Sequence, residues 1–259
     1  MAHKIARYGW VPDLPDQRDH MYAAPPPVLS ALPPSFDLTP KCPPVYDQGQ
    51  IGSCTANAIA GALEFDRMKQ ALQDFVPSRL FIYYNERAME GTVNSDSGAM
   101  IRDGIKSVAT LGDCPEKQWP YDGSPFPPNP KLTQKPPQSC YTQALKYKAV
   151  QYQRLSQILA QLKGCLASGY PFVFGFTVYE SFESSTVAQT GHASLPSPGE
   201  GVVGGHAVMA VGYDDAHQWF IIRNSWGTGW GMKGYFTLPY AYLTDRHLSS
   251  DFWTIRLVQ

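Results

Sequence analysis

The sequence has 259 residues, 43% of them hydrophobic and 17% charged, a composition typical of a globular chain with a sizeable core. Its 21 basic and 22 acidic residues give a net charge of −1, without the basic excess typical of nucleic-acid binding. Because no run approaches the roughly 18 apolar residues of a membrane span, we expect neither nucleic acid nor a membrane span among its partners.

The chain opens with an unusual region. Residues 1–31 are rich in proline and aromatic residues and show neither a helical nor an alternating period, which predicts an extended arm. This region also lacks the apolar core of a signal peptide. The sequence leaves the compartment unknown and favours a cytoplasmic protein or one exported without a cleaved signal.

Helical patterns dominate residues 32–145. Apolar residues recur at helical spacing after Cys54, and a second helix is predicted across 78–90 with Gly91 placed to end it. A third helix is predicted over 101–108 and closed by Gly112. Residues 121–140 are rich in proline and predict an irregular connection.

Strand patterns dominate residues 146–259. One further helix is predicted from a stripe formed by Leu155, Leu159, Leu162 and Leu166. The runs PFVFGFTV, HAVMAVGY, WFIIRNS, GYFTL and DFWTIRLV then predict short strands, and the segment 182–204 predicts a surface loop. We therefore expect an α+β fold of two lobes with a cleft between them.

Cys54 lies where a glycine-rich loop is expected to enter a helix, and a helix N-terminus favours the thiolate. His206 follows Gly204 and Gly205 and opens a predicted strand. The amide oxygen of Asn224 could fix the tautomer of this imidazole. The side-chain amide of Gln48 could face an oxyanion together with the backbone N–H of Cys54.

Each of these residues also has a plainer interpretation. A cysteine at the start of a helix is most often a small buried hydrophobe, and a histidine beside two glycines often belongs to a turn. Asn224 could serve a turn, and Gln48 could be a solvated loop residue. The combination of all these residues in this order favours nucleophilic catalysis over the separate structural interpretations.

Three sequence blocks strengthen this hypothesis: QGQIGSC, GHAVMAVGY and IIRNSWGTGWGMKGYF resemble the signature blocks of papain-like (cathepsin, C1-type) cysteine peptidases. The run LPPSFDL resembles the mature start of that family, so the resemblance covers the chain from about Leu32 to its end. The helix SRLFIYYNERAMEG and the short N-terminal region look most like the compact bacterial branch that includes xylellain.

The resemblance implies a papain-like endopeptidase with its active site between a helical lobe and a barrel-like β lobe. Cys54 would be the nucleophile, His206 the general acid and base, Asn224 its orienting residue and Gln48 the oxyanion donor. Trp226 would shield the bond between histidine and asparagine from water. No cofactor is implied, only a reduced thiol.

The resemblance also implies a substrate-binding strip. Ser97 and Gly98 correspond to backbone that pairs with the substrate, and Gly98 keeps that pairing possible. A pocket for the second residue before the scissile bond would be lined by Ala99, Met100, Gly204 and Gly205. Because these side chains are apolar or absent, we expect an apolar substrate residue there.

The five cysteines depart from the family pattern, because both halves of one usual disulfide are missing. We therefore expect Cys42, Cys114, Cys140 and Cys165 to be free. Two other functions stay open at this point: an acyltransferase or transglutaminase-like enzyme, and a catalytically silent peptide-binding module on the same fold. Product analysis with an added amine would separate the first from a peptidase, and covalent labelling by an epoxide inhibitor would separate an active enzyme from the second.

The arm leaves its own alternatives open. It is too short for the helical pro-domain usual in this family, yet it carries Tyr8, Trp10 and Tyr22 as candidate aromatic anchors. It could cross the cleft and block peptide or protein substrates as a short pro-segment, lie along one lobe as a strap, or be disordered.

Overall fold

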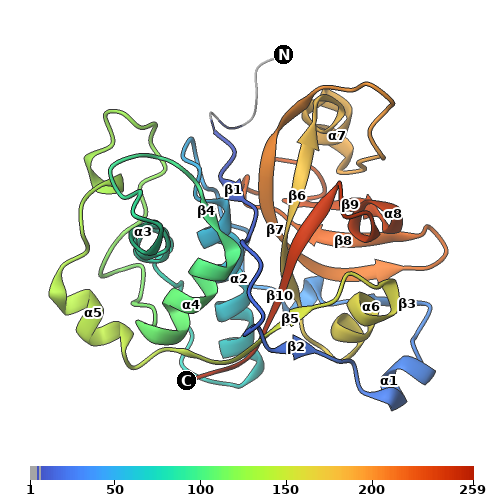
Figure 1. The fold of residues 1–259 in the computed structure, drawn as a ribbon, viewed down its shortest axis with the longest axis horizontal. Coiled ribbons are helices and arrows are strands. Elements are labelled where there is room, and N and C mark those ends of the chain that lie inside the picture. Colours follow the sequence, from blue (N-terminus) through green and yellow to red (C-terminus); the bar gives the residue numbers. More distant parts are fainter. Residues whose placement is uncertain (1–4, 6) are drawn as a thin grey trace.

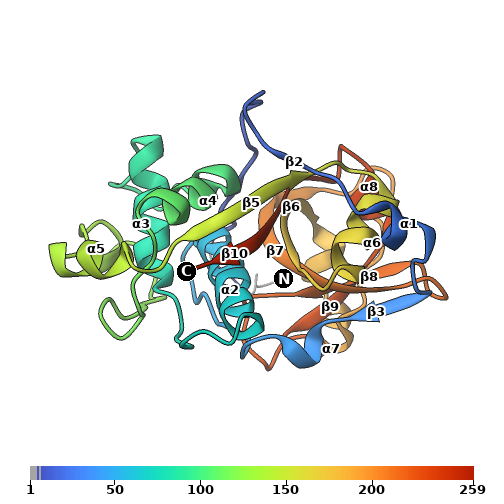
Figure 2. The same cartoon turned by 90° about the horizontal axis from the view of Figure 1, so that it is seen from below.

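The computed structural model of the protein describes residues 5 and 7–259, so the expected arm begins with positions outside the described residues. Helices gather on one side and a large sheet on the other, with α2 (Cys54–Lys69) between them (Figure 1 and Figure 2). The other helices are α1 (Pro26–Ser30), α3 (Arg79–Glu90), α4 (Ile101–Thr110), α5 (Gln138–Ala144), α6 (Leu159–Ala167), α7 (Ser185–Thr190) and α8 (Tyr240–Thr244). Short 3-10 turns lie at Thr39–Lys41, Pro130–Leu132 and Glu180–Glu183.

The strands form an eight-stranded sheet in the order β2-β5-β10-β6-β7-β8-β9, with β3 paired on β7 beside this path. Its members are β2 (Met21–Tyr22), β3 (Ser35–Asp37), β5 (Ala149–Leu155), β6 (Phe172–Tyr179), β7 (Val202–Asp214), β8 (Trp219–Arg223), β9 (Tyr235–Pro239) and β10 (Ser249–Val258). No pairing among the described residues joins β2 to β9, so the sheet is open rather than a closed barrel. The mixture of helices and sheet confirms the expected α+β class.

Helix α2 is buried along most of its length, and small side chains explain its position. Every residue from Cys54 to Arg67 is buried. A Cβ added to Gly61 would lie 2.6 Å from Nη1 of Arg223 in β8, so glycine is needed for this close approach. The packing brings the first residue of α2, Cys54, to the junction of the helical half and the sheet.

The helices predicted after Cys54, across 78–90 and over 101–108 are confirmed, as are the predicted strand runs of the second half. Helix α3 begins after Ser78, whose hydroxyl oxygen accepts a hydrogen bond from the Phe81 N–H at 3.3 Å. It ends at Gly91, whose φ of 73° is the left-handed conformation that glycine supplies at helix ends.

Two expectations of local structure are wrong because tertiary pairing overrides the local pattern. Leu155 ends strand β5, where it pairs with Tyr22, and the helix of the leucine stripe begins only at Leu159. The segment 182–204 is not entirely loop. Its first part forms α7, which is capped by Ser184, and its last residues open β7.

The arm was expected to be extended throughout, but Pro26–Ser30 form α1, where prolines occupy the first turn that tolerates them. Before this helix the arm crosses the junction of the two halves (Figure 1). Its strand β1 (Trp10–Val11) lies parallel to β4 (Ala99–Met100) of the helical half, and β2 lies parallel to β5 of the sheet. The arm is therefore paired with both halves.

Among the described residues, no helix has the length and apolar character needed to cross a membrane.

Candidate active site

The four residues predicted to be catalytic come from different elements and are all buried. Gln48 lies in the loop before α2, Cys54 opens α2, His206 lies in β7 and Asn224 directly follows β8. The pairing of β7 with β8 brings the histidine and the asparagine together. The N-terminus of α2 faces the same place, because the backbone N–H of Ala207 forms a hydrogen bond with the Cys54 thiol.

The His206 ring is held at one nitrogen and unpartnered at the other. Its Nε2 lies 2.8 Å from Oδ1 of Asn224, which also accepts a hydrogen bond from the Ser225 N–H at 2.8 Å. An amide oxygen can only accept, so the neutral ring carries its proton on Nε2 and keeps a lone pair on Nδ1. That Nδ1 is buried without a hydrogen-bond partner among the described residues, as a base awaiting a proton would be.

Trp226 covers this hydrogen bond. Its ring stacks on that of His206, with centroids 4.9 Å apart and an angle of 28° between the planes. Trp226 is 1% exposed, so it separates the imidazole from solvent on that side. The expected shielding contact is therefore present.

Both polar atoms of the Gln48 side-chain amide form hydrogen bonds that fix its orientation. Its Oε1 accepts a hydrogen bond from the Ser225 hydroxyl at 2.7 Å, and its Nε2 donates to the carbonyl oxygen of Ile51 at 3.0 Å. An amide nitrogen carries two hydrogens, so one N–H of Gln48 remains for another acceptor.

Burial governs the ionisation of the thiol and the imidazole. It raises the pKa of Cys54 to about 12, although backbone N–H groups of Ala207 and Gly9 oppose this change. Burial also lowers the pKa of His206 to about 4, although the hydrogen bond that its ring donates to Asn224 opposes this change. Both groups are therefore uncharged at neutral pH in this arrangement, and the reactive thiolate is suppressed.

Several residues of the expected substrate strip lie against the arm. The backbone N–H of Ala99 donates to the carbonyl oxygen of Gly9 at 2.8 Å, and a Cβ added to Gly98 would lie 2.2 Å from that oxygen. Gly204 and Gly205 face the arm too, against Tyr8 and Trp10 respectively. The hydroxyl of Ser97 donates a hydrogen bond to Oγ1 of Thr92 at 2.9 Å.

The sequence analysis did not identify two residues, Asp96 and Tyr83, that hold the substrate strip and the loop before Cys54 in place. The carboxylate of Asp96 accepts hydrogen bonds from the Gly52 N–H at 3.0 Å and from the Tyr83 hydroxyl at 2.5 Å. The same hydroxyl oxygen accepts a hydrogen bond from the Gly98 N–H at 3.1 Å. Asp96 and Tyr83 thus connect the loop before Cys54 to the strip. A single aspartate in a polar loop gives no sequence signal of such a role.

The arm occupies the space in front of the thiol. A Cβ added to Gly9 would lie 1.7 Å from the carbonyl oxygen of Gly52, so the arm lies directly against the loop before Cys54. The ring of Tyr8 meets that of His206 edge-on, with centroids 5.9 Å apart, and its hydroxyl donates to Glu183. Gly9 directs its N–H toward the thiol and its carbonyl toward Ala99, so it does not present a carbonyl carbon for attack.

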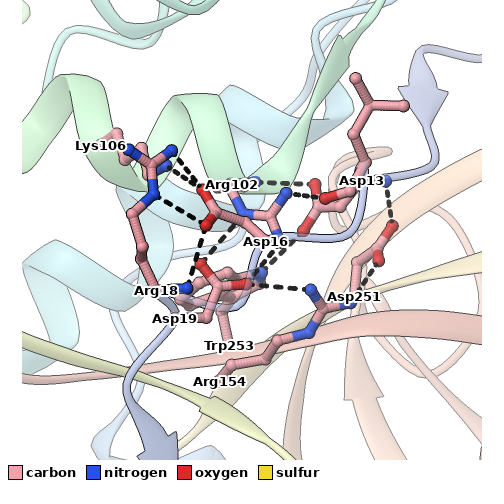
Figure 3. Close-up of polar contacts among 10 residues, drawn as sticks. Asp13, Asp16, Arg18, Asp19, Arg102, Lys106, Arg154, Asp251 and Trp253 are labelled. Carbon is pink, nitrogen blue, oxygen red and sulfur yellow. Dashed lines mark hydrogen bonds and ion pairs between the residues drawn. The ribbon is translucent and has the colours of Figure 1, made fainter.

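An ion-pair network holds the next part of the arm. The arm contributes Asp13, Asp16 and Asp19, and the two halves contribute Arg102, Lys106 and Arg154 (Figure 3). Oδ2 of Asp19 forms ion pairs with Nη2 of Arg102 and with Nη1 of Arg154, the latter at 3.1 Å. Because Arg102 lies in α4 and Arg154 in β5, the pair connects both halves through the arm.

Asp13 lies at the inner end of this network. Its carboxylate accepts hydrogen bonds at 2.9 Å from the Arg102 backbone N–H and from Nε1 of Trp253. Burial, together with the nearby charge of Asp251, raises the pKa of Asp13 to about 6.

All five cysteines of the chain are free, as expected for Cys42, Cys114, Cys140 and Cys165.

Comparisons with known proteins agree with this geometry. The model of the family described as papain family cysteine protease matches residues 32–242. A peptidase C1-like protein of Acanthamoeba polyphaga mimivirus is 47% identical over 221 residues, which cover 82% of this chain and 69% of that protein. A cathepsin B-like protein of Giardia intestinalis is 31% identical over 239 residues, with 80% and 69% covered.

Solved structures show the same likeness. Xylellain, a cysteine protease from Xylella fastidiosa, superposes with a TM-score of 0.94 at 49% identity, covering 100% of this chain and 99% of that chain. A procathepsin B of Trypanosoma congolense reaches a TM-score of 0.75 at 20% identity, covering 95% and 85%, a likeness of fold alone. The resemblance to compact bacterial members is confirmed.

Proposed function

The chain belongs to the papain family of cysteine proteases and is a cysteine peptidase, and we propose that it is an endopeptidase with Cys54, His206 and Asn224 as its catalytic triad. The hydrogen bond from His206 Nε2 to Asn224 Oδ1 carries this proposal. It leaves Nδ1 as the only ring nitrogen that can take the thiol proton.

In this mechanism the Cys54 thiolate attacks the scissile carbonyl carbon and the C–O double bond becomes an oxyanion. The remaining N–H of Gln48 and the backbone N–H of Cys54 stabilise that charge. His206 then protonates the leaving amine, which yields a thioester. It next removes a proton from water, whose oxygen attacks the thioester and releases the acid and the thiol.

Substitution of Gln48 tests the mechanism. Gln48→Ala should lower kcat by about 10²–10³ with little change in KM, because an oxyanion donor acts mainly in the transition state. Hydrolysis of blocked peptide amides measures both constants. Gln118→Ala, at an exposed position, serves as the matched control and should retain both.

A rise in KM without a fall in kcat would contradict the oxyanion role, and thermal unfolding of each variant separates a loss of chemistry from a loss of folding.

The reaction products distinguish the alternative functions. Release of the free acid in the presence of an added amine supports a peptidase, whereas transfer to the amine identifies an acyltransferase. Once the arm is displaced, a folded chain that neither hydrolyses peptides nor is modified at Cys54 by an epoxide inhibitor would be a silent binding module.

We also propose that the chain is latent while its arm occupies the cleft. The contacts of Tyr8 and Gly9 support this, because they fill the space that a peptide needs beside Cys54 and His206. A tethered segment needs only weak intrinsic affinity, since a short linker gives an effective concentration on the order of millimolar. Activation then requires displacement or removal of the arm.

The pKa of Asp13 predicts how this latency responds to pH. The pKa is about 6 in the docked arm against an ordinary value of 3.8, so the docked state retains a proton that the released state loses. The contribution of Asp13 to docking is therefore strongest at low pH and weakens as pH rises through 6, by about tenfold between pH 5 and pH 7. Asp251, Arg102 and Trp253 face this carboxyl group.

The measurement is peptide hydrolysis by the full chain divided by that of a full-length Gly9→Ala variant, in which the arm cannot fit. Because docking also buries Cys54 and His206, this ratio still contains their titration, which a chain carrying Asp13→Asn shares. Between pH 5 and pH 7 the ratio should therefore rise by about tenfold more in the native chain than in the chain with Asp13→Asn. The same pH dependence with and without Asp13→Asn would exclude Asp13 as the titrating group.

A further inference from the structure

The loop before Cys54 and the substrate strip meet at one buried carboxylate. Asp96 is 3% exposed, and both of its oxygens lie 3.0 Å from the backbone nitrogen of Gly52, which donates its N–H to them. Oδ1 also accepts a hydrogen bond from the Tyr83 hydroxyl at 2.5 Å, and the hydroxyl oxygen accepts one from the Gly98 N–H at 3.1 Å. Tyr83, Asp96 and the N–H groups of these two glycines form the Asp96 cluster.

Helix α3 supports the cluster through a second side chain. Arg87 lies one turn after Tyr83 in α3, and its guanidinium carbon lies 4.0 Å from the centroid of the tyrosine ring. Its Nη1 donates to the carbonyl oxygens of Val93 at 3.2 Å and of Ser95 at 2.8 Å, just before Asp96. Because Arg87 and Tyr83 are both buried, the loop that carries Asp96 is oriented from the core.

Each end of the cluster holds backbone that the proposed reaction uses. Gly52 lies two residues before Cys54, whose own N–H is one of the proposed oxyanion donors. Gly98 directly precedes Ala99, whose N–H donates to the carbonyl oxygen of Gly9 in the arm at 2.8 Å. Once the arm leaves, that N–H is available to the main chain of a substrate. The cluster therefore sets the distance between the oxyanion donor and the backbone that holds the substrate.

The cluster also lies beside the positions of a covalent link that the family usually has. By resemblance, the two halves of the missing disulfide correspond to Ile51 and Ser95, which directly precede Gly52 and Asp96. The hydrogen bonds of the Asp96 cluster connect the same two segments without a thiol. Unlike a disulfide, this connection does not depend on an oxidising environment.

We propose that Asp96 and Tyr83 are positioning residues for the reaction. Asp96 acts on the oxyanion donor through Gly52. Tyr83 acts on the substrate-binding backbone through Gly98. This inference rests on the proposed peptidase function and deepens it. Displacement of reacting groups by about 1 Å can cost about 100-fold in rate, so hydrogen bonds that fix these groups affect catalysis without touching the substrate.

Substitution of the aspartate tests the first role. The parent is the full-length Gly9→Ala chain, in which the arm is displaced, and hydrolysis of a blocked peptide amide gives kcat and KM. Both carboxylate oxygens face the Gly52 N–H. Asp96→Asn therefore puts an amide donor against that N–H whichever way the amide is turned. We expect kcat to fall by about 10–100-fold, with a smaller rise in KM.

Substitution of the tyrosine tests the second role. Tyr83→Phe nearly conserves volume, keeps the hydrogen bonds between Gly52 and Asp96, and removes the acceptor of the Gly98 N–H. The substrate must then order this backbone itself. We expect KM to rise by about tenfold while kcat stays within about twofold of the parent.

Two matched controls should keep both constants. Tyr84→Phe changes the next residue of α3, whose hydroxyl has no hydrogen bond among the described residues. Asp245→Asn changes another carboxylate that accepts a backbone N–H, that of His247 at 2.8 Å, in an exposed turn after α8.

Unchanged kcat in a folded Asp96→Asn variant, or unchanged KM in Tyr83→Phe, overturns the inference. A lower thermal unfolding temperature with both constants unchanged would identify a structural role alone. If Asp96→Asn does not fold, Tyr83→Phe decides by its KM. A parent chain that hydrolyses no peptide contradicts the proposed peptidase function, whereas an active parent with two unaffected variants contradicts only this inference.

Discussion

Replacement of Cys54 by alanine should abolish peptide hydrolysis, the largest loss of activity expected for any single substitution in the chain. The reason is chemical, because the thioester cannot form without the thiol and no other group here can replace it as nucleophile. Cys42→Ala is the matched control and should retain activity, since that thiol is hydrogen bonded to the Leu38 carbonyl away from His206. Peptide turnover of both variants, with thermal unfolding as a folding check, measures the effect.

Alkylation gives an independent reading of the same thiol. In the closed chain burial raises the pKa of Cys54 to about 12, so its labelling should be slow. Once Gly9→Ala lifts the arm, water reaches the thiol and imidazole, and Cys54 should react faster than the other four cysteines at mildly acidic pH. Equal labelling of all five in the open variant would remove Cys54 from the nucleophile role.

The residues of the proposed triad could be chosen from the sequence because each of them lies in a local pattern. Cys54 follows a glycine-rich loop, His206 opens a strand and Asn224 ends another. The pairing of β7 with β8 then makes contacts that the order of predicted strands already implies. Local sequence patterns and a family resemblance were sufficient to propose these residues.

The remaining features of the site depend on packing between distant segments. Asp251 of β10 accepts a hydrogen bond from Trp10 of the arm, which lies far away in sequence, and this contact leaves no periodic signal. Asp96 and Leu155 illustrate the same limit, since tertiary partners decide what each does. Sequence patterns identified the aromatic anchors of the arm but could not choose between a strap and a blocking segment.

Gly9→Ala should raise the activity of the full-length chain, and we expect this to be the largest gain available from one substitution. The added Cβ would lie 1.7 Å from the Gly52 carbonyl oxygen, which no side chain can tolerate, so the arm must leave the cleft locally. If the open state of the native chain is about 1% populated, full release gives a gain of about 100-fold. Gly229→Ala is the matched control, because a Cβ there meets no atom within 4 Å.

The same experiment separates a blocking arm from a structural strap. A blocking arm predicts higher kcat/KM in Gly9→Ala, and Trp10→Ala should reproduce part of the gain by emptying the pocket that anchors the arm. A strap predicts a lower thermal unfolding temperature with unchanged kcat/KM, because the ion pairs of Asp19 to both halves would be strained without any change at the thiol. A blocking arm changes kcat/KM and a strap changes only the unfolding temperature, because only a segment in front of Cys54 competes with substrate. Unchanged kcat/KM in both arm variants would therefore exclude latency.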